Sequence, residues 1–388
     1  MELALKEAEQ RLVKEVHYFL VRETTPELLA ETIRLGSIYG GTEARKLVQK
    51  MGAKGWLCPS WPVEYGGLGT SEMVRMTILD DMAYLGLPTI FVGANMAGPT
   101  ILKYGGEDTK RAFLPDIARG TVEYALGYTE PHAGSDLAAL EMRAEDMGDY
   151  FILNGQKMFN THCHVADHHW LLARTDSNAA KHKGISLMVV DLKSPGITIR
   201  PMVTAAGWQT NEVFYDDVKV PKKSLVGDIN RGFYYVMNAL DFERMLPIGA
   251  YRRLFDELVA HTKETRVNGQ PLSKNPVVRQ KLAELAIEME AAYHLYYQLA
   301  YLLDKGDVPG YQSSMEKVFA SEFSQHLTNT GIQILGPYGQ LRKGSKWAPI
   351  DGSMVFHYLT SIVETTYGGT SEIQRNIIAL RGLGLPAK

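Results

Sequence analysis

Residues 127–136 read Gly-Tyr-Thr-Glu-Pro-His-Ala-Gly-Ser-Asp, and this stretch carries the strongest indication of the fold. The hydroxyls of Thr129 and Ser135 can donate hydrogen bonds, and the small residues between them let backbone approach a flat ligand closely. The stretch therefore predicts a loop that lines a planar ligand with a polar edge. Taken alone, it is equally compatible with a glycine-rich loop that ends in an Asx-type turn at Ser135 and Asp136.

Three further phrases follow at separations that make the first one specific. They are Asn-Gly-Gln-Lys-Met-Phe-Asn-Thr at 154–161, Leu-Asp-Phe-Glu-Arg at 240–244 and Tyr-Gly-Gly-Thr-Ser-Glu-Ile-Gln at 367–374. In this order the four phrases resemble the signature segments of the FAD-dependent acyl-CoA dehydrogenase family. The resemblance covers almost the whole chain. It implies an α+β multidomain fold with an N-terminal helical domain, a middle antiparallel β-barrel-like domain and a C-terminal helical bundle.

Hydrophobic periodicity supports the same order of helix, strand and helix. It predicts helices at 27–35, 73–83, 280–303 and 315–335, and strands at 150–153, 170–173, 185–190, 197–199 and 212–215. We place the domains at 1–122, 123–235 and 236–388. The Asn154-Gly155 pair follows the first predicted strand, and such a pair favours a tight hairpin turn.

The resemblance assigns the flavin contacts to the first two phrases. It implies that Tyr128 and Thr129 contact the pyrimidine edge of FAD, and that Ser135 serves the flavin or the thioester. The second phrase would form the other wall of the site, with Thr161 near the flavin N5. The cofactor-binding residues expected here are Tyr128, Thr129, Gly134, Ser135, Phe159, Asn160 and Thr161. The chain has no G-x-G-x-x-G fingerprint, and this family binds FAD without one.

The family completes the adenylate half of FAD with residues of a neighbouring subunit. Gln333 and Gly336 match a Gln-Ile-Leu-Gly-Gly phrase, and Thr370 and Glu372 belong to the last signature phrase. The usual Arg-x-x-Phe-Gly phrase is replaced by Thr-Arg-Val-Asn-Gly at 265–269, where Arg266 is shifted by one position and the aromatic residue is missing. The resemblance implies a homodimer or homotetramer, because one subunit alone does not complete the FAD site.

The catalytic base departs from the commonest family pattern. Many members carry it as glutamate in a C-terminal Glu-Gly-Thr phrase, where this chain has Gly368. Isovaleryl-CoA and long-chain type members place it on an earlier helix, in a phrase like the one that contains Glu243. The resemblance therefore points to Glu243 as the base and to the Gly368 N–H as a donor to the thioester carbonyl. The alternative for Glu243 is an ordinary solvent-facing helical glutamate.

The same resemblance assigns the substrate contacts. It implies that Ser135, Asp241, Arg244 and Gly369 lie near the acyl-CoA, and an arginine suits the charged end of CoA. For Asp241 and Arg244, an ion pair within or between helices is an equally weighted alternative. A base on the earlier helix, with glycine at 368, leaves room beside the reacting carbons, so we expect a branched, cyclic or otherwise bulky acyl group.

Composition narrows the class of protein further. The 388 residues have a net charge of −3, which argues against a nucleic-acid footprint, and no apolar run approaches the roughly 20 residues of a membrane span. Two cysteines and the absence of a signal-like start favour the cytoplasm.

Four histidines cluster beside Cys163, but their spacing does not favour a metal site. They are His162, His164, His168 and His169.

The resemblance implies that the electrons pass to an electron-transferring flavoprotein. Two other functions stay open at this point. One is a flavin monooxygenase or oxidase on the same fold. The other is a non-catalytic subunit that binds FAD or CoA within a heteromeric dehydrogenase.

Overall fold

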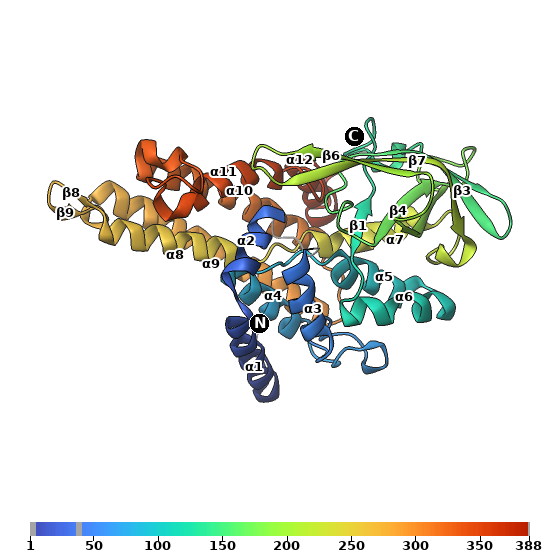
Figure 1. Cartoon of the computed structure of the whole chain (residues 1–388), viewed down its shortest axis with the longest axis horizontal. Helices are drawn as coiled ribbons and strands as arrows, with labels where there is room; N and C mark the ends of the chain where they lie inside the picture. The colour runs from blue at the N-terminus through green and yellow to red at the C-terminus, as the bar shows by residue number, and fades with distance from the viewer. Residues whose placement is uncertain (1–4, 36–40, 387–388) are drawn as a thin grey trace. The chain divides into compact units, whose positions relative to one another are not determined.

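The computed structural model describes residues 5–35 and 41–386, and for residues 238–243 it describes the backbone but not the side chains. The chain forms two compact units. The sheet unit contains Arg22–Arg75 and Leu87–Glu243, and the helical unit contains Met1–Val21, Met76–Gly86 and Arg244–Lys388. Figure 1 colours the chain from blue at the N-terminus to red at the C-terminus and labels most of the longer elements.

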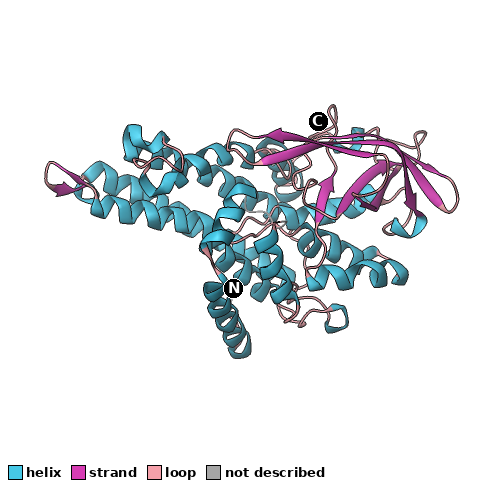
Figure 2. Ribbon diagram, viewed as in Figure 1, coloured by secondary structure: helices cyan, strands magenta, loops and turns pink. Residues whose placement is uncertain are grey.

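The sheet unit is built on a seven-stranded sheet with the path β1-β4-β2-β3-β7-β6, in which β5 also pairs with β4. The strands are β1 (Tyr124–Gly127), β2 (Arg143–Asp146), β3 (Tyr150–Lys157), β4 (His168–Arg174), β5 (Ile185–Asp191), β6 (Ile197–Val203) and β7 (Gln209–Pro221). Most pairs are antiparallel, as predicted, whereas β1 and β2 pair with β4 in parallel. The strands form one curled layer (Figure 2).

Helices of the sheet unit precede and follow the sheet. They are α2 (Pro26–Leu35), α3 (Thr42–Gly52), η1 (Val63–Tyr65), the π-helix η2 (Gly93–Ala97), α5 (Gly98–Tyr104), α6 (Glu107–Arg119), η3 (Leu137–Ala139), η4 (Lys222–Ser224) and α7 (Gly232–Glu243). Two helices, α1 (Glu7–Glu23) and α4 (Glu72–Leu85), run from one unit into the other. The helices predicted at 27–35 and 73–83 are therefore confirmed.

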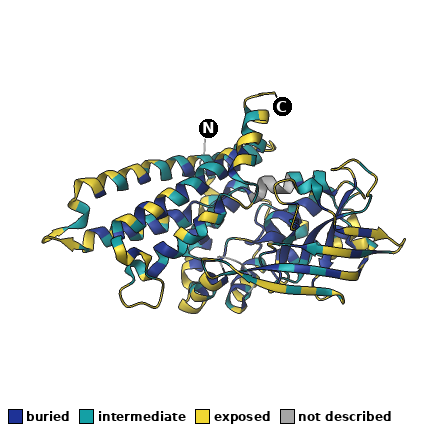
Figure 3. Ribbon diagram, turned by 90° about the horizontal axis from the view of Figure 1, so that it is seen from above, coloured by how far each residue is buried: buried dark blue, intermediate teal, exposed yellow. Residues whose placement is uncertain are grey.

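The core of the sheet follows from the alternation of its strands. In β3, Phe151 and Leu153 are buried while their neighbours are only partly covered. They pack with buried residues of β4, β5 and β7 in one apolar cluster. The β5 strand is buried along almost its whole length, as its continuous apolar run predicts. Buried residues line the strands in Figure 3.

The hairpin predicted at Asn154-Gly155 is wrong. Both residues lie inside β3, and the register against β7 shifts between Leu153 and Gly155. This is a β-bulge, and Gly155 has φ of 144°, which a side chain rarely adopts. A Cβ there would also approach Met142 Cγ to 2.9 Å. Pairing with β7 therefore overrides the local preference for a turn.

The helical unit is dominated by two long helices. Its elements are α8 (Gly249–Glu264), β8 (Arg266–Val267), β9 (Gln270–Pro271), η5 (Leu272–Lys274), α9 (Pro276–Asp304), α10 (Gly310–Leu335), η6 (Gly336–Gln340), η7 (Pro349–Gly352), α11 (Ser353–Glu364), α12 (Ser371–Ile377) and η8 (Ile378–Gly382). The Asn275 side chain caps α9 by accepting from the N–H of Val277 at 2.9 Å, and Pro276 occupies the first turn. The helices predicted at 280–303 and 315–335 are thus confirmed.

Helix α10 is the centre of the helical unit, because it packs against α8, α9, α11 and α12. Its buried face is unusually polar and includes Glu316 and Lys317. In the described part of the chain, no helix is both long and apolar enough to cross a membrane. The α+β fold class is confirmed, and the boundaries at residues 122 and 235 stay predictions.

Candidate active site

The first signature phrase forms a loop at the end of strand β1. Gly127 closes the strand, and a Cβ there would meet the His169 ring at 2.7 Å, so only glycine fits. Within the loop, Glu130 and Ala133 exchange two backbone hydrogen bonds of 3.1 Å. Tyr128 is buried, Thr129 is partly exposed, and Gly134 and Ser135 are exposed. The loop is therefore anchored at its start and open at its end.

A buried ion pair ties this loop to the end of strand β3. Lys157 is 0% exposed, and its Nζ lies 2.8 Å from Glu130 Oε1 and 3.1 Å from the Tyr128 carbonyl oxygen. The Glu130 carboxylate also accepts from the N–H groups of Glu141 at 2.7 Å and Met142 at 3.0 Å. Burial lowers the pKa of Lys157 to about 8, and Glu130 opposes this shift. Both charges are thus compensated inside the sheet unit.

The second phrase forms the other wall beside this loop. Phe159 is 60% exposed and has φ of 57°, which is uncommon for an aromatic residue. Asn160 is buried, and its Nδ2 donates to the Leu126 carbonyl at 2.8 Å. The Met158 N–H donates to the Thr129 carbonyl at 2.8 Å, and Thr161 Oγ1 lies 3.2 Å from Thr210 Oγ1. The two predicted walls are therefore joined in the structure.

Three features of these walls fit a flavin. The buried Asn160 Oδ1 has no hydrogen-bond partner among the described residues. The Thr129 N–H likewise has no acceptor in the described part of the chain. Phe159 presents an exposed ring in a strained backbone conformation, which is a feature of functional sites. A planar ligand with polar edges would satisfy the orphaned groups and cover the ring.

The histidines near Cys163 contribute to packing inside the sheet unit. His169 is buried, hydrogen-bonds to the Tyr215 hydroxyl and stacks on its ring. Burial lowers the pKa of His169 to about 3 and lowers that of His162 well below its ordinary value, so both are neutral at pH 7. Among the described residues, no group of three metal-ligating side chains converges.

The helix that carries the predicted base is α7, which ends at Glu243. It packs against β5 and against the π-helix η2 within the sheet unit. The side chains of Asp241 and Glu243 lie outside the described residues, so their assigned roles stay predictions.

The helical unit holds Gly368 and Gly369 by their carbonyl oxygens. Gln374 Nε2 donates to the Gly368 oxygen at 2.8 Å and to the Gly369 oxygen at 3.1 Å. Lys317 Nζ donates to Gly369 at 2.9 Å, and Arg244 Nε lies 3.5 Å from the Gly368 oxygen. All three donor side chains are buried. The structure therefore brings the predicted residues Arg244, Gly368 and Gly369 together.

Both glycines need their conformational freedom. Gly368 has φ of 64° and Gly369 has φ of 91°, and a Cβ on Gly369 would meet Gln374 Nε2 at 2.5 Å. A glutamate at position 368 would therefore adopt a left-handed backbone here.

The predicted cofactor residues Thr370 and Glu372 line one cavity of about 280 Å3 in the helical unit. Thr370 caps helix α12, because its Oγ1 accepts from the Ile373 N–H at 3.3 Å. Hydrogen bonds from its own backbone N–H and from Thr370 lower the pKa of Glu372. Arg375 pairs with Glu322 at 2.8 Å on the same wall. The lining is polar and holds two carboxylates, Glu322 and Glu372, against one arginine, so it offers no net positive charge.

The remaining predicted residues lie elsewhere in the helical unit. Arg266 is exposed on the β8–β9 hairpin, where its Nη1 donates to the Gly269 carbonyl at 3.2 Å. Gln333 is exposed near the end of α10 and accepts from Lys281 Nζ at 2.7 Å. Gly336 ends that helix with φ of 64°. The fold thus exposes Arg266 and Gln333 on the surface, where a second subunit can reach them.

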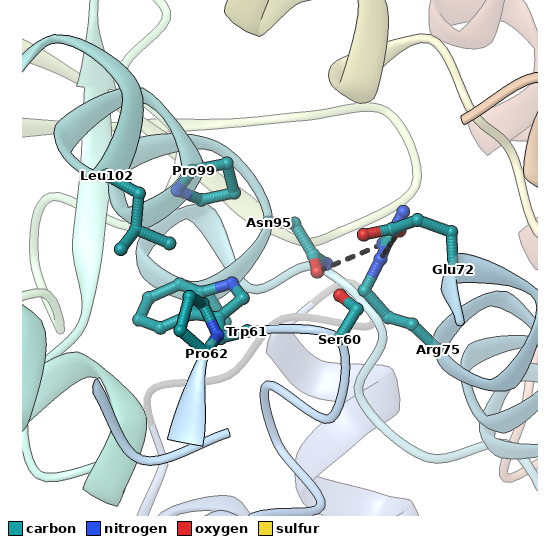
Figure 4. Close-up of a pocket in the computed structure, with 9 residues that line it drawn as sticks. Ser60, Trp61, Pro62, Glu72, Arg75, Asn95, Pro99 and Leu102 are labelled. Carbon is teal, nitrogen blue, oxygen red and sulfur yellow. Dashed lines mark hydrogen bonds and ion pairs between the residues drawn. The ribbon is translucent and has the colours of Figure 1, made fainter. Parts of the chain in front are cut away.

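A second cavity of about 180 Å3 lies in the sheet unit beside Trp61 (Figure 4). Arg75 is buried in its wall and contacts Asn95 Oδ1 at 3.4 Å. Glu72 Oε2 lies 2.5 Å from Arg75 Nε and balances its charge. The cavity therefore offers no net positive charge to an anion.

Sequence reasoning missed the residues that support the site. Lys157 and Glu130 both stand inside the signature phrases, yet nothing local marks them as buried. Lys317 and Gln374 were also missed. Lys317 could have been found from its position, because it falls within the amphipathic helix predicted at 315–335. A lysine on the inner face of such a helix is rarely buried without a partner, so it predicts a polar contact there.

The family follows from this architecture and from direct comparison. The chain matches the acyl-CoA dehydrogenase N-terminal domain at residues 6–121, the middle domain at 125–218 and the C-terminal domain at 230–383. The chain belongs to the acyl-CoA dehydrogenase family and is an oxidoreductase of that class. Members of the family are flavoproteins, and FAD is their usual cofactor.

Individual relatives match over the full length. The chain is 34% identical to acyl-CoA dehydrogenase FadE26 of Mycobacterium tuberculosis (strain ATCC 25618 / H37Rv), covering 100% of this chain and 99% of FadE26. It is similar to the Tcur3481-Tcur3483 steroid ACAD, with 34% identity, a TM-score of 0.91 and complete coverage of both chains. It is also similar to a chain of the ChsE4-ChsE5 complex from Mycobacterium tuberculosis, with 33% identity, a TM-score of 0.90 and complete coverage of both.

Proposed function

We propose that this chain forms the α,β-double bond of a bulky acyl-CoA, with FAD as its cofactor. When bound, FAD accepts the β-hydrogen as hydride. An electron-transferring flavoprotein receives the electrons, and the protein acts in the cytoplasm. The observation that carries this proposal is the full-length family match combined with glycine at position 368, where the commoner base is missing.

Glu243 supplies the base for the α-proton in this proposal. The α C–H is weakly acidic, so a positioned carboxylate is needed, and general base catalysis contributes roughly 10²–10⁴. The Gly368 N–H stabilises the thioester oxygen as charge develops there, an effect worth about 3 kcal/mol for one donor. The support is that buried side chains hold the Gly368 and Gly369 carbonyls, which keeps this backbone rigid.

The substrate class rests on the small residue at 368 and on the relatives. Glycine leaves space where other members carry a glutamate side chain. A relative at 34% identity is named a steroid ACAD, which is consistent with a branched or cyclic acyl group.

An anaerobic titration of the purified protein with a panel of acyl-CoAs tests this function. We expect branched or cyclic thioesters to bleach the oxidised flavin absorbance, and Glu243→Gln to abolish the bleaching. Glu264→Gln, on the exposed end of α8, is the matched control and keeps wild-type behaviour. Turnover limited to short straight chains would contradict the substrate class. A bound flavin that no thioester reduces, together with rapid oxygen consumption in a separate aerobic assay without acyl-CoA, would favour the oxidase.

A second candidate is a non-catalytic subunit that binds FAD or CoA within a heteromeric dehydrogenase. Its support is the β8–β9 hairpin, in which Arg266 is displaced and the aromatic residue of the family phrase is missing. A chain of the ChsE4-ChsE5 complex is also among the similar structures. Expression of this chain alone discriminates the two: a homomer with one FAD per chain supports the homodimer or homotetramer, whereas a chain that retains FAD only with a homologous partner supports the heteromer.

A further inference from the structure

The buried Lys157 has no role in the proposed chemistry, yet it contacts the loop that the flavin would use. Its Nζ donates to the Tyr128 carbonyl at 3.1 Å and to Glu130 at 2.8 Å. Charged side chains are almost never fully buried unless they are paired. Because burial of an ammonium group costs desolvation energy, we expect Lys157 to do more than fill space in the core.

The geometry of the peptide between Tyr128 and Thr129 supplies that reason. In a trans peptide, the carbonyl of one residue and the N–H of the next point in opposite directions. Lys157 holds the Tyr128 carbonyl toward the interior, so the Thr129 N–H points away from Lys157. That N–H has no acceptor in the described part of the chain. Lys157 therefore determines where a backbone donor is presented.

The next peptide is held just as firmly. The Thr129 carbonyl accepts from the Met158 N–H at 2.8 Å, and the Glu130 N–H donates to the Ala133 carbonyl at 3.1 Å. The carboxylate of Glu130 accepts two more backbone N–H groups from residues 141 and 142. Lys157, at the end of strand β3, and Met158, directly after it, thus hold both peptides that flank Thr129.

We infer that Lys157, balanced by Glu130, is a positioning residue that aims the Thr129 N–H at the pyrimidine edge of the flavin and strengthens it as a donor. An ammonium close to a carbonyl oxygen polarises the peptide, and hydrogen bonds in such chains strengthen one another at low dielectric. Donors at the pyrimidine edge favour the reduced flavin, which carries more negative charge there. Lys157 would therefore raise both FAD affinity and the reduction potential.

The inference rests on the proposed flavin site, and its test reads the bound cofactor rather than turnover. The wild-type protein is compared with three variants. They are Lys157→Met, the double variant Lys157→Met with Glu130→Gln, and Lys222→Met. Lys222 is the matched control, because it pairs with Asp146 in the same unit but is 38% exposed. Circular dichroism of each apoprotein verifies folding, and FAD titration with dye-coupled redox titration then gives the dissociation constant and midpoint potential.

We expect Lys157→Met to weaken FAD binding at least tenfold. We also expect it to lower the preference for reduced over oxidised flavin tenfold, which is about 30 mV for a two-electron couple. The double variant leaves no uncompensated charge, so it keeps the fold while retaining the negative shift in potential. Lys222→Met keeps wild-type values.

Two results would overturn the inference, and they are distinguishable. A double variant that is folded and shows the wild-type potential would reduce Lys157 to a structural role. A single variant that fails to fold leaves this decision to the double variant. A wild-type protein that binds no FAD would remove the proposed function itself, and the inference with it.

Discussion

The sheet unit and the helical unit both bury a lysine against a backbone carbonyl, but in the helical unit Gln374 also donates to that carbonyl. Lys157 contacts the Tyr128 carbonyl and, at 2.8 Å, a carboxylate that itself accepts two backbone N–H groups. Lys317 contacts the Gly369 carbonyl at 2.9 Å, whereas the buried Glu316 beside it in sequence bonds to the Leu246 N–H at 3.3 Å. The contact in the sheet unit thus includes a buried carboxylate, and the carbonyl in the helical unit is shared with Gln374.

The difference teaches where each unit is vulnerable. In the sheet unit, removal of Lys157 takes the buried counter-charge from Glu130 and leaves only the half-exposed His132, 3.7 Å away, which is costly. In the helical unit, Gln374 also donates to both glycine carbonyls, so the loss of Lys317 leaves those carbonyls with a partner. Burial raises the pKa of Glu316 well above its ordinary value, which favours the neutral carboxylic acid. The Gly369 carbonyl therefore does not depend on one donor alone.

The largest expected effect on stability comes from breaking the ion pair between Lys157 and Glu130 in the sheet unit. Lys157→Met should destabilise the apoprotein by about 3–5 kcal/mol, because Glu130 is left charged in the core. The double variant Lys157→Met, Glu130→Gln should recover part of that loss. Urea denaturation, monitored by fluorescence, measures the unfolding free energy of both variants. The control Lys222→Met should lose no more than about 1 kcal/mol. Equal losses in the single and double variants would contradict a charge-based explanation.

Lys317→Met should cost less, about 1.5–3 kcal/mol, which is the range for a hydrogen bond from a charged donor. The Gly369 carbonyl keeps Gln374 at 3.1 Å, so no buried acceptor is left without a donor. We also expect turnover to fall while the FAD dissociation constant stays within a few-fold of wild type. Paired denaturation and steady-state kinetics measure the two effects.

Lys305→Met, at the exposed end of the α9 helix, is the matched control for Lys317→Met. If Lys317→Met lost FAD as strongly as Lys157→Met, the two lysines would serve the same site and the contrast between the units would fail.

The most gradual effect concerns Glu123, a buried carboxyl in the sheet unit that accepts from the Gly93 N–H at 3.2 Å. Burial raises its pKa from 4.5 to about 8. The folded state therefore holds this proton across that window while the unfolded state has lost it, so stability falls as pH rises from about 4.5 to 8. One proton corresponds to at most about 1.4 kcal/mol per pH unit.

Melting temperatures of wild type and Glu123→Gln, measured between pH 5 and pH 8, check this sign. The substitution should flatten the decline, because glutamine does not titrate. An unchanged or steeper pH dependence would show that Glu123 ionises normally in the folded protein, which would contradict the prediction.

Much of the fold was predictable because its signals are local. The apolar spacing at 280–303 and 315–335 marks the helices that the structure confirms as α9 and α10. The runs at 185–190 and 197–199 mark β5 and β6. The hairpin predicted at Asn154-Gly155 was wrong. The turn preference of this pair is local, but the pairing of β3 with β7 determines the backbone conformation there.

The site was predictable only in part. The first two signature phrases lie beside one another in the structure, and Arg244 lies beside Gly368, but the roles of these residues toward a ligand stay predictions. The roles of Glu243 and Asp241 stay predictions. Lys157 was missed because its partner, Glu130, stands 27 residues earlier in the chain.

By itself, the sequence determined the family, the order of helices and strands, and the phrases that mark the site. Those properties depend on neighbours within a few residues, and apolar spacing or motif identity reports them directly. Only the tertiary structure decided which charged residues are buried, which carbonyls they hold and which backbone N–H groups are left for a ligand. Such pairings join segments that are distant in sequence, and their energies depend on desolvation, which no local pattern records.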